Sequence, residues 1–130
     1  MSRVRTGGRA DATAHLGKAQ EFLEAARAAL DAKWHNAAAS SAVTAGINAK
    51  DALCFAMVGR TTAGDNHKSA VSELRALGPA ARESATALDR LLGLKDRAQY
   101  DRRGVSATEA QAAVRRATTM VDAAKRALLQ

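Results

Sequence analysis

The stretch that decides the fold is NAAASSAVTAGINAKDALCFAMV, residues 36–58. Alanine, the strongest helix former, is its commonest residue, and it contains no proline. Its larger apolar residues recur at helical spacing and form one inward face, comprising Val43, Ile47, Cys54 and Met57. Because much of that face is alanine, a neighbouring helix can approach closely. The stretch therefore predicts a long helix packed against another helix.

Similar apolar stripes continue on both sides of this stretch. Further helices are expected, in chain order, at about 11–33, 67–77 and 80–92. The sequence Ser106-Ala-Thr-Glu109 has the form of a capping box, which places the start of the last helix there. Loops are expected at 59–66 and 94–104. The chain as a whole predicts an all-α, up-and-down bundle of four to five helices.

Composition limits the class of protein. The chain has 130 residues, with 33 Ala but only 22 Leu, Ile, Val and Phe together, so we expect a single domain over residues 11–130. Sheet-rich enzyme folds are excluded because strands favour the β-branched and aromatic residues that are scarce here. Residues 1–10 carry Arg3, Arg5 and Arg9 without an acidic residue, and we expect them to form a flexible basic arm.

Three absences bear on the compartment. The sequence has no run of about 18 apolar residues that could span a membrane. Its basic, glycine-rich first ten residues lack the apolar core of a secretory signal. Cys54 is the single cysteine and cannot form an internal disulfide. We therefore expect a cytoplasmic protein that does not associate with a membrane.

The sequence contains no recognisable metal or cofactor motif. His15, His35 and His67 stand alone, without the spacing of helical zinc or di-iron ligands. Gly59 and Gly64 enclose no Gly-Lys-Ser/Thr sequence, so a phosphate-cradling loop is not expected. We therefore expect no metal and no cofactor.

The densest polar patch is LKDRAQYDRR, residues 94–103, which holds the single tyrosine. Its candidate ligand-binding residues are Lys95, Asp96, Arg97, Tyr100, Arg102 and Arg103. In a helix, Asp96 and Tyr100 share a face with Lys95 at its edge, and these groups together could bind a phosphate or a nucleotide. The alternative is a corner of the bundle at which Tyr100 is buried, its hydroxyl group is satisfied and the charged side chains are solvated.

Trp34 and the overall charge are the remaining signals. Trp34 stands between the first two helices and is expected to cover the end of the core, although it could instead stack on a base. The net charge of +7 and the isoelectric point near 10.3 favour anionic partners. The cations, however, are spread along every expected helix with acidic residues between them.

The order of these segments resembles a HEPN domain (higher eukaryotes and prokaryotes nucleotide-binding). The resemblance covers nearly the whole chain after residue 10 and is greatest to small stand-alone bacterial members. It is carried by AAASSAVTAGINAKDALC, GRTTAGDNHKSAVSEL, LLGLKDRAQYD and VSATEAQAAVRRATTMVDAAKRAL. The resemblance implies a bundle of four or five helices that pairs as a homodimer.

The resemblance also implies a candidate site. Ribonuclease members of the family carry an Arg, an adjacent polar residue and, after a short gap, a His, and they cleave RNA without a metal. The matching positions here are Lys95, Asp96 and Tyr100. A phenol is a poor proton acceptor near neutral pH, and an ammonium lacks the planar fork of a guanidinium. We therefore expect a non-catalytic or degenerate HEPN module that binds a nucleotide, an RNA or a protein partner through residues 95–103.

Two alternatives stay open. One is a metal-independent endoribonuclease, an RNase toxin with an altered motif, that uses Lys95, Asp96 and Tyr100. The other is a helix-turn-helix DNA reader in which VSATEAQ forms the turn. The resemblance further implies a toxin–antitoxin or defence setting and a nucleotidyltransferase-type protein partner.

Overall fold

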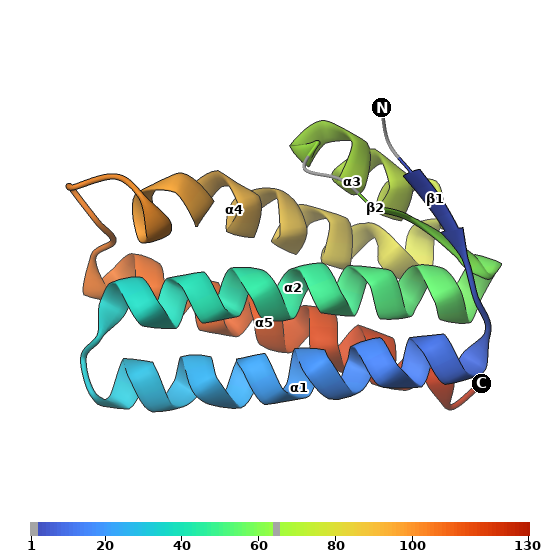
Figure 1. The fold of residues 1–130 in the computed structure, drawn as a ribbon, viewed down its shortest axis with the longest axis horizontal. Coiled ribbons are helices and arrows are strands. Elements are labelled where there is room, and N and C mark those ends of the chain that lie inside the picture. The colour runs from blue at the N-terminus through green and yellow to red at the C-terminus, as the bar shows by residue number, and fades with distance from the viewer. Residues whose placement is uncertain (1–2, 64–65) are drawn as a thin grey trace.

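The computed structural model describes residues 3–63 and 66–130. Within those residues, four long helices run up and down beside one another: α1 (Arg9–Asp31), α2 (His35–Val58), α4 (Arg82–Gln99) and α5 (Ala107–Leu128) (Figure 1). Helices α2 and α5 each contact the other three. The all-α bundle predicted from the sequence is confirmed. None of the helices in the described ranges is long and apolar enough to cross a membrane.

Smaller elements cover one end of the bundle. Strands β1 (Arg3–Thr6) and β2 (Arg60–Ala63) form an antiparallel two-stranded ribbon, and helix α3 (His67–Arg75) packs beside it against α4 (Figure 1). A 3-10 turn, η1 (Pro79–Ala81), leads from α3 into α4. The ribbon and α3 therefore form a second layer over part of the bundle.

Helix α2 is central because it packs against the other three long helices and half of its residues are buried. Half of its twelve buried residues are alanine, and Val43, Leu53, Cys54 and Phe55 are among the others. At Gly46 the neighbouring helices come closer than a side chain would allow, since a Cβ there would lie 2.7 Å from Leu91 Cδ1. Small residues on α2 therefore set the helix spacing, and bulkier side chains from the surrounding helices fill the core.

The sequence located the start of α5 correctly but not the end of α4. Ser106 and Glu109 form the predicted capping box, in which each side chain accepts a hydrogen bond from the backbone of the other at 3.1 Å. The prediction that the fourth helix ends at residue 92 is wrong, because α4 continues through Gly93. Leu91 and Leu94 are both buried, and packing of that apolar stripe outweighs the roughly 1 kcal/mol that a glycine costs inside a helix.

Part of the segment expected to be a flexible arm is ordered. Arg3 pairs with Ala63 and Thr6 with Arg60, and the Gly7 N–H extends the ribbon by donating to Gly59 O at 3.0 Å. Residues 60–63, expected to be a loop, are strand β2 instead. Pairing between segments so far apart leaves no local sequence signal. Residues 1–2 of the expected arm and 64–65 of the expected loop lie outside the described residues.

The connection between α4 and α5 contains a glycine that the fold requires. Gly104 has a φ of +68°, and a Cβ there would lie 2.8 Å from Asn36 Oδ1. That same oxygen accepts a hydrogen bond from the Val105 N–H at 2.8 Å and so ties the start of α2 to the start of α5. A side chain at position 104 would both strain the backbone and displace this bond.

We expect Gly104→Ala to lower the free energy of unfolding by about 1–3 kcal/mol, through positive-φ strain and loss of the Asn36 contact. Gly17→Ala is the matched control, because Gly17 lies within α1 and a Cβ there meets nothing within 4 Å. The control should raise the free energy of unfolding by up to about 1 kcal/mol. Urea denaturation followed by circular dichroism measures both, and equal stability of the two variants would contradict the role of Gly104.

Candidate functional site

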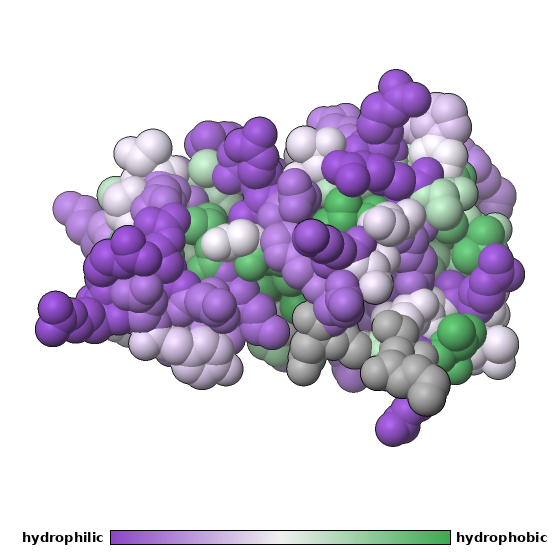
Figure 2. Space-filling view, turned by 90° about the horizontal axis from the view of Figure 1, so that it is seen from above, coloured by the Kyte–Doolittle hydropathy of each residue, from purple (hydrophilic) through white to green (hydrophobic). Residues whose placement is uncertain are grey.

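A cavity of about 590 Å³ lies between the two layers. The ribbon and α3 side contributes Arg5, Thr62, Ala63, Asn66, His67 and Ala70. The bundle side contributes Ile47, Lys50 and Asp51 from α2 and Leu88, Leu92, Lys95 and Asp96 from α4. Figure 2, which looks down on the layer of α3, α4 and the ribbon, shows a mostly hydrophilic surface with hydrophobic residues visible between the polar ones. The cavity thus combines an apolar stretch of wall with charged groups of both signs.

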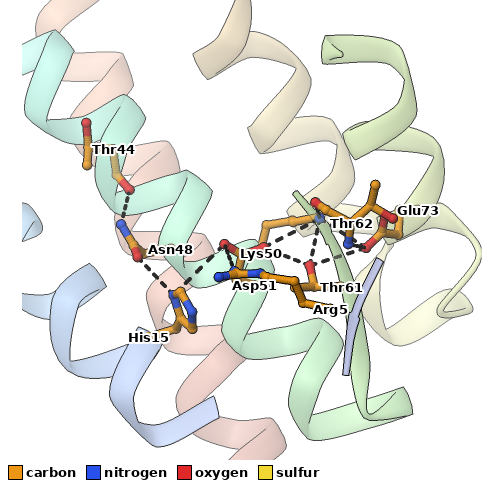
Figure 3. A network of polar contacts seen from close by, with 9 residues as sticks. All are labelled: Arg5, His15, Thr44, Asn48, Lys50, Asp51, Thr61, Thr62 and Glu73. Atoms are coloured by element: carbon orange, nitrogen blue, oxygen red, sulfur yellow. Dashed lines mark hydrogen bonds and ion pairs between the residues drawn. The ribbon is translucent and has the colours of Figure 1, made fainter. Parts of the chain in front are cut away.

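One wall of the cavity is fixed by a buried ammonium group. Lys50 is only 3% exposed, although it lies within the alanine-rich helix α2. Its Nζ donates to Thr61 Oγ1 at 2.8 Å and to Thr62 O at 3.0 Å, and it lies 3.0 Å from Glu73 Oε1 (Figure 3). An ammonium has three N–H donors, so Lys50 has none left for a ligand. It therefore serves to fasten β2 and α3 onto α2.

Glu73 completes this network from α3. One of its oxygens accepts a hydrogen bond from the Thr62 N–H at 2.8 Å and lies beside Lys50 Nζ. Burial raises the pKa of Glu73, but the hydrogen bonds from Thr62 and Lys50 outweigh it and bring the pKa down to about 2. The carboxylate is thus held in its ionised form next to the buried ammonium.

Asp51 links this network to the N-terminal strand. It accepts a hydrogen bond from Thr61 Oγ1 at 2.7 Å, and its other oxygen lies 3.7 Å from Arg5 and 3.9 Å from the His15 ring (Figure 3). The Arg5 guanidinium lies 5.9 Å from the centre of the Phe55 ring. Arg5, placed by the sequence in a flexible arm, is therefore held at the rim of the cavity.

Lys50, Asp51 and Glu73 were not predicted as site residues from the sequence. A signal existed for Lys50, since Lys50 and Asp51 are the two charged residues of the alanine-rich stretch 36–58. Charged residues are almost never fully buried without a partner. Such a lysine therefore indicates an acidic partner elsewhere, but no local pattern identifies that partner as Glu73.

Of the six residues proposed from the sequence, the structure brings Lys95 and Asp96 to the cavity. Lys95 is partly buried and makes no ion pair within the described residues. His67 lies on the opposite wall, where its Nε2 is 2.8 Å from Asp89 Oδ1 of α4. Lys95 is thus the cation on α4 that is available to a ligand in the cavity.

The other four candidates lie elsewhere. Arg97 forms a two-pronged ion pair with Glu109, and the hydrogen bond from Arg97 lowers the Glu109 pKa to about 2. Tyr100 is the C-cap of α4 and is 79% exposed, outside the cavity. Arg102 is exposed, and Arg103 pairs with Asp101 at 3.1 Å. The 95–103 patch is therefore divided between the cavity and the end of the bundle.

Burial was predicted for two further residues, Trp34 and Cys54, and only Cys54 is buried. Trp34 is 67% exposed, so the prediction that it covers the core is wrong. Val105 is the buried core residue near that end, and its N–H donates a hydrogen bond to Asn36 Oδ1. Cys54 is buried in the core as its place on the apolar stripe indicates, and burial raises the pKa of its thiol to about 12.

Among the residues that the structure describes, no three His, Cys, Asp or Glu side chains gather as metal ligands.

We expect Glu73→Gln to lower the free energy of unfolding by about 1–3 kcal/mol near neutral pH. Because the Glu73 pKa is lowered on folding, its stabilising contribution is present above about pH 4.5 and disappears as pH falls toward 2. The difference from the unmodified protein should therefore shrink in that window. Glu24→Gln is the control, since Glu24 forms an exposed pair with Arg27. Urea titrations at several pH values that give a constant Glu73→Gln effect would disprove the ionised network.

The comparisons with known proteins agree with this architecture. No curated protein matches the chain. The family model for the HEPN domain matches residues 12–127. This span includes α2 and α4 completely, α1 and α5 except for residues 9–11 and 128, and both lysines that line the cavity. That span is most of the 130 residues. The chain therefore belongs to the HEPN domain family.

Proposed function

We propose that this HEPN domain is a non-catalytic module that binds a nucleotide in the cavity between the ribbon and the bundle. The observation that carries the proposal is the position of Lys95, a partly buried cation that lines a cavity of about 590 Å³ and has no ion-pair partner among residues 3–63 and 66–130. That volume lies within the range of about 300–1,000 Å³ typical of small-molecule sites. Cations supply affinity for phosphate, as the net charge of +7 also does.

The cavity offers a group for each part of such a ligand. Lys95 and Arg5 can contact phosphate oxygens with charge-assisted hydrogen bonds. Ile47, Leu88 and Leu92 form an apolar surface on which a base can lie. The Asp96 carboxylate accepts hydrogen bonds and suits the hydroxyl or amino groups of a nucleoside.

The arrangement of the motif residues favours binding over RNA cleavage. Lys95 and Asp96 line the cavity, but Tyr100 stands outside it. Arg97, the guanidinium nearest in sequence, is occupied by Glu109. A general base has to reach the proton that it removes, and the phenol does not share a cavity with the ammonium.

The biological setting belongs to the same proposal. Family membership supports a homodimer, a nucleotidyltransferase-type protein partner and a toxin–antitoxin or defence role, as expected from the resemblance. We further propose the cytoplasm as the compartment, on the basis of the single buried cysteine.

We expect Lys95→Gln to weaken nucleotide binding by about tenfold, the effect of losing one charge-assisted hydrogen bond. Isothermal titration calorimetry with AMP, ADP and ATP measures the change. Lys18→Gln is the matched control, because Lys18 is an exposed lysine of α1 outside the cavity. If both variants bind alike, or the unmodified protein binds none of the three nucleotides, the cavity is not a nucleotide site.

We also expect no cleavage when the purified protein is incubated with end-labelled RNA in the presence of EDTA. Neither Tyr100 nor Arg97 is placed to act with Lys95 in the cavity. Gel analysis of the RNA over time is the measurement. Cleavage that survives EDTA and disappears in Tyr100→Phe would establish the ribonuclease alternative in place of the binding module.

A further inference from the structure

The alternation of backbone groups along the ribbon defines an open edge on β1. In an antiparallel pair, residues that exchange hydrogen bonds with the partner strand alternate with residues whose N–H and C=O groups point away from it. The Gly7 N–H donates to Gly59 O at 3.0 Å, which sets this alternation in the register of the ribbon. Counted back from Gly7, the N–H and C=O groups of Thr6 and Val4 point away from β2. These four groups form the outer edge of β1.

The corresponding edge of β2 is closed by side chains of α2 and α3. Thr62 pairs with Val4 in the ribbon. Its N–H donates to Glu73 Oε1 at 2.8 Å, and its carbonyl accepts from Lys50 Nζ at 3.0 Å (Figure 3). Both bonds lead away from β1, as the alternation requires. They occupy the groups that a further strand would need on the β2 side.

The outer edge of β1 is not closed in this way. No hydrogen bond among residues 3–63 and 66–130 involves the outer N–H or C=O group of Val4 or Thr6. Val4 is 60% exposed, and Thr6 is exposed as well. Strand β1 lies on the side of the ribbon away from α3 and packs mainly against β2 (Figure 1). An open strand edge of this kind is a template for an additional strand.

The side chains of the ribbon indicate the charge of a strand that would fit. Arg3 and Arg60 are exposed and make no ion pair within the described ranges. Arg5 lies 3.7 Å from Asp51, and 45% of its side chain remains exposed. Arg9, at the start of α1, donates to a backbone carbonyl of α5. Four guanidinium groups therefore lie on or beside the ribbon.

The acidic side chains around the ribbon compensate only part of this charge. Asp51 and Glu73 lie in the polar network beneath the ribbon, where Glu73 is paired with Lys50. Asp11 accepts a hydrogen bond at 3.0 Å from the backbone N–H at the N-cap of α1. Asp65 follows β2 in the sequence and lies outside the described residues. In the part of the chain that the structure describes, only Asp51 forms an ion pair with one of the four arginines, so the ribbon keeps an excess of positive charge.

Two other occupants match the edge less well. Pairing of β1 with β1 of a second copy would set arginines opposite arginines, and like charges directly opposite each other destabilise a strand pair. A nucleic acid could contact the guanidinium groups, but phosphate oxygens accept hydrogen bonds and would leave the carbonyl groups of the edge without donors. A peptide strand supplies both the donors and the acceptors that the edge needs.

We propose that the outer edge of β1 binds an extended acidic segment of a partner protein as a third, antiparallel strand of the ribbon. The backbone of the segment exchanges hydrogen bonds with Val4 and Thr6. Its carboxylates lie opposite Arg3 and Arg5, at the roughly 5 Å that separates the Cβ atoms of directly opposed residues. An apolar or β-branched side chain lies opposite Val4. Binding there does not require a nucleotide in the cavity, although Arg5 borders both sites.

The test uses a fluorescein-labelled peptide of about nine residues, long enough for one strand, that alternates valine with glutamate. In the proposed pairing, the valine N–H groups face β1 and the glutamate N–H groups face solvent. N-methylation of the glutamates should therefore preserve the rise in fluorescence anisotropy on binding, and it also prevents the peptide from pairing with itself. N-methylation of the valines should abolish the rise, although charge and composition are the same.

A backbone substitution tests the same edge from the side of the protein. Val4→Pro should weaken binding by at least about tenfold, because proline lacks an N–H and its ring crowds an added strand. The Val4 N–H makes no bond to β2, so the proline is compatible with the ribbon itself. Val4→Thr is the matched control, since it keeps the N–H and a β-branched side chain and should bind as the unmodified protein does. Circular dichroism melting shows whether each variant is folded.

A charge substitution tests the choice of an acidic partner. Arg3→Glu should weaken binding of the glutamate peptide about three- to tenfold, and a peptide with lysine in place of glutamate should not bind the unmodified protein. Arg115→Glu is the matched control, because it makes the same change in net charge at an exposed arginine of α5. Lys95→Gln should bind the peptide as tightly as the unmodified protein, so failure of the nucleotide site is distinguishable from failure of this one.

Four results would overturn the proposal. The first is an unchanged anisotropy with the glutamate-methylated peptide. The second is binding of the valine-methylated peptide at least as tight as that of the glutamate-methylated one, and this comparison is decisive even if Val4→Pro does not fold. The third is a single-stranded oligonucleotide that binds more tightly than the peptide and is weakened by Arg3→Glu. The fourth is a dimer mass in light scattering that Val4→Pro converts to a monomer mass, with no peptide binding, which would assign the edge to a second copy of the chain.

Discussion

The structure depends on the burial of one positive charge, the Lys50 ammonium. Taking an ammonium out of water costs several kcal/mol unless hydrogen bonds and an opposite charge replace its hydration. Thr61 and Thr62 of β2 and Glu73 of α3 supply these replacements. Because the three groups come from segments outside the four-helix core, the charge is satisfied only when the ribbon and α3 lie in place. The layer of the ribbon and α3 is thereby held by this polar network together with the buried Val71 and Leu74 of α3, whereas alanine-rich packing specifies the bundle.

This constraint separates the roles of the two lysines that line the cavity. Lys50 has used all its donors and shapes the wall, while Lys95 has no ion-pair partner in the described residues and faces the same space. Of the two lysines in the cavity wall, Lys50 therefore stabilises the fold and Lys95 can contact a ligand. The same division runs through the 95–103 patch, where Arg97 joins α4 to α5 and Tyr100 is left in solvent.

The sequence predicted those features whose cause is local. The alanine-rich stripe of residues 36–58 and the Ser106–Glu109 capping box are patterns within a few turns of chain. Both form as predicted, except that Met57, expected on the inward face, is 39% exposed near the end of α2. The ribbon and the Lys50–Glu73 pair were missed because each joins segments distant in sequence, and a four-residue strand has little pattern of its own. Trp34 was misjudged because average burial describes tryptophans in general, while the turn after Lys33 directs this one outward. Lys95 and Asp96 were predicted because charged residues are dense in that part of the sequence. The density of charge does not show which residues of the helix face the cavity, so the other four candidates were predicted with them.

The ribbon has a further consequence for the order in which the molecule assembles. Strand β1 cannot meet β2 until α1 and α2 have brought the two segments to the same end of the bundle. It is joined to the rest by a few backbone hydrogen bonds and the Arg5 contacts, so it is also the element that can detach without disturbing the helical core. Each such opening carries Arg5 away from the cavity. Occupancy of the cavity and closure of the N-terminal strand are therefore thermodynamically linked, and a ligand that touches Arg5 shifts the strand toward its docked position.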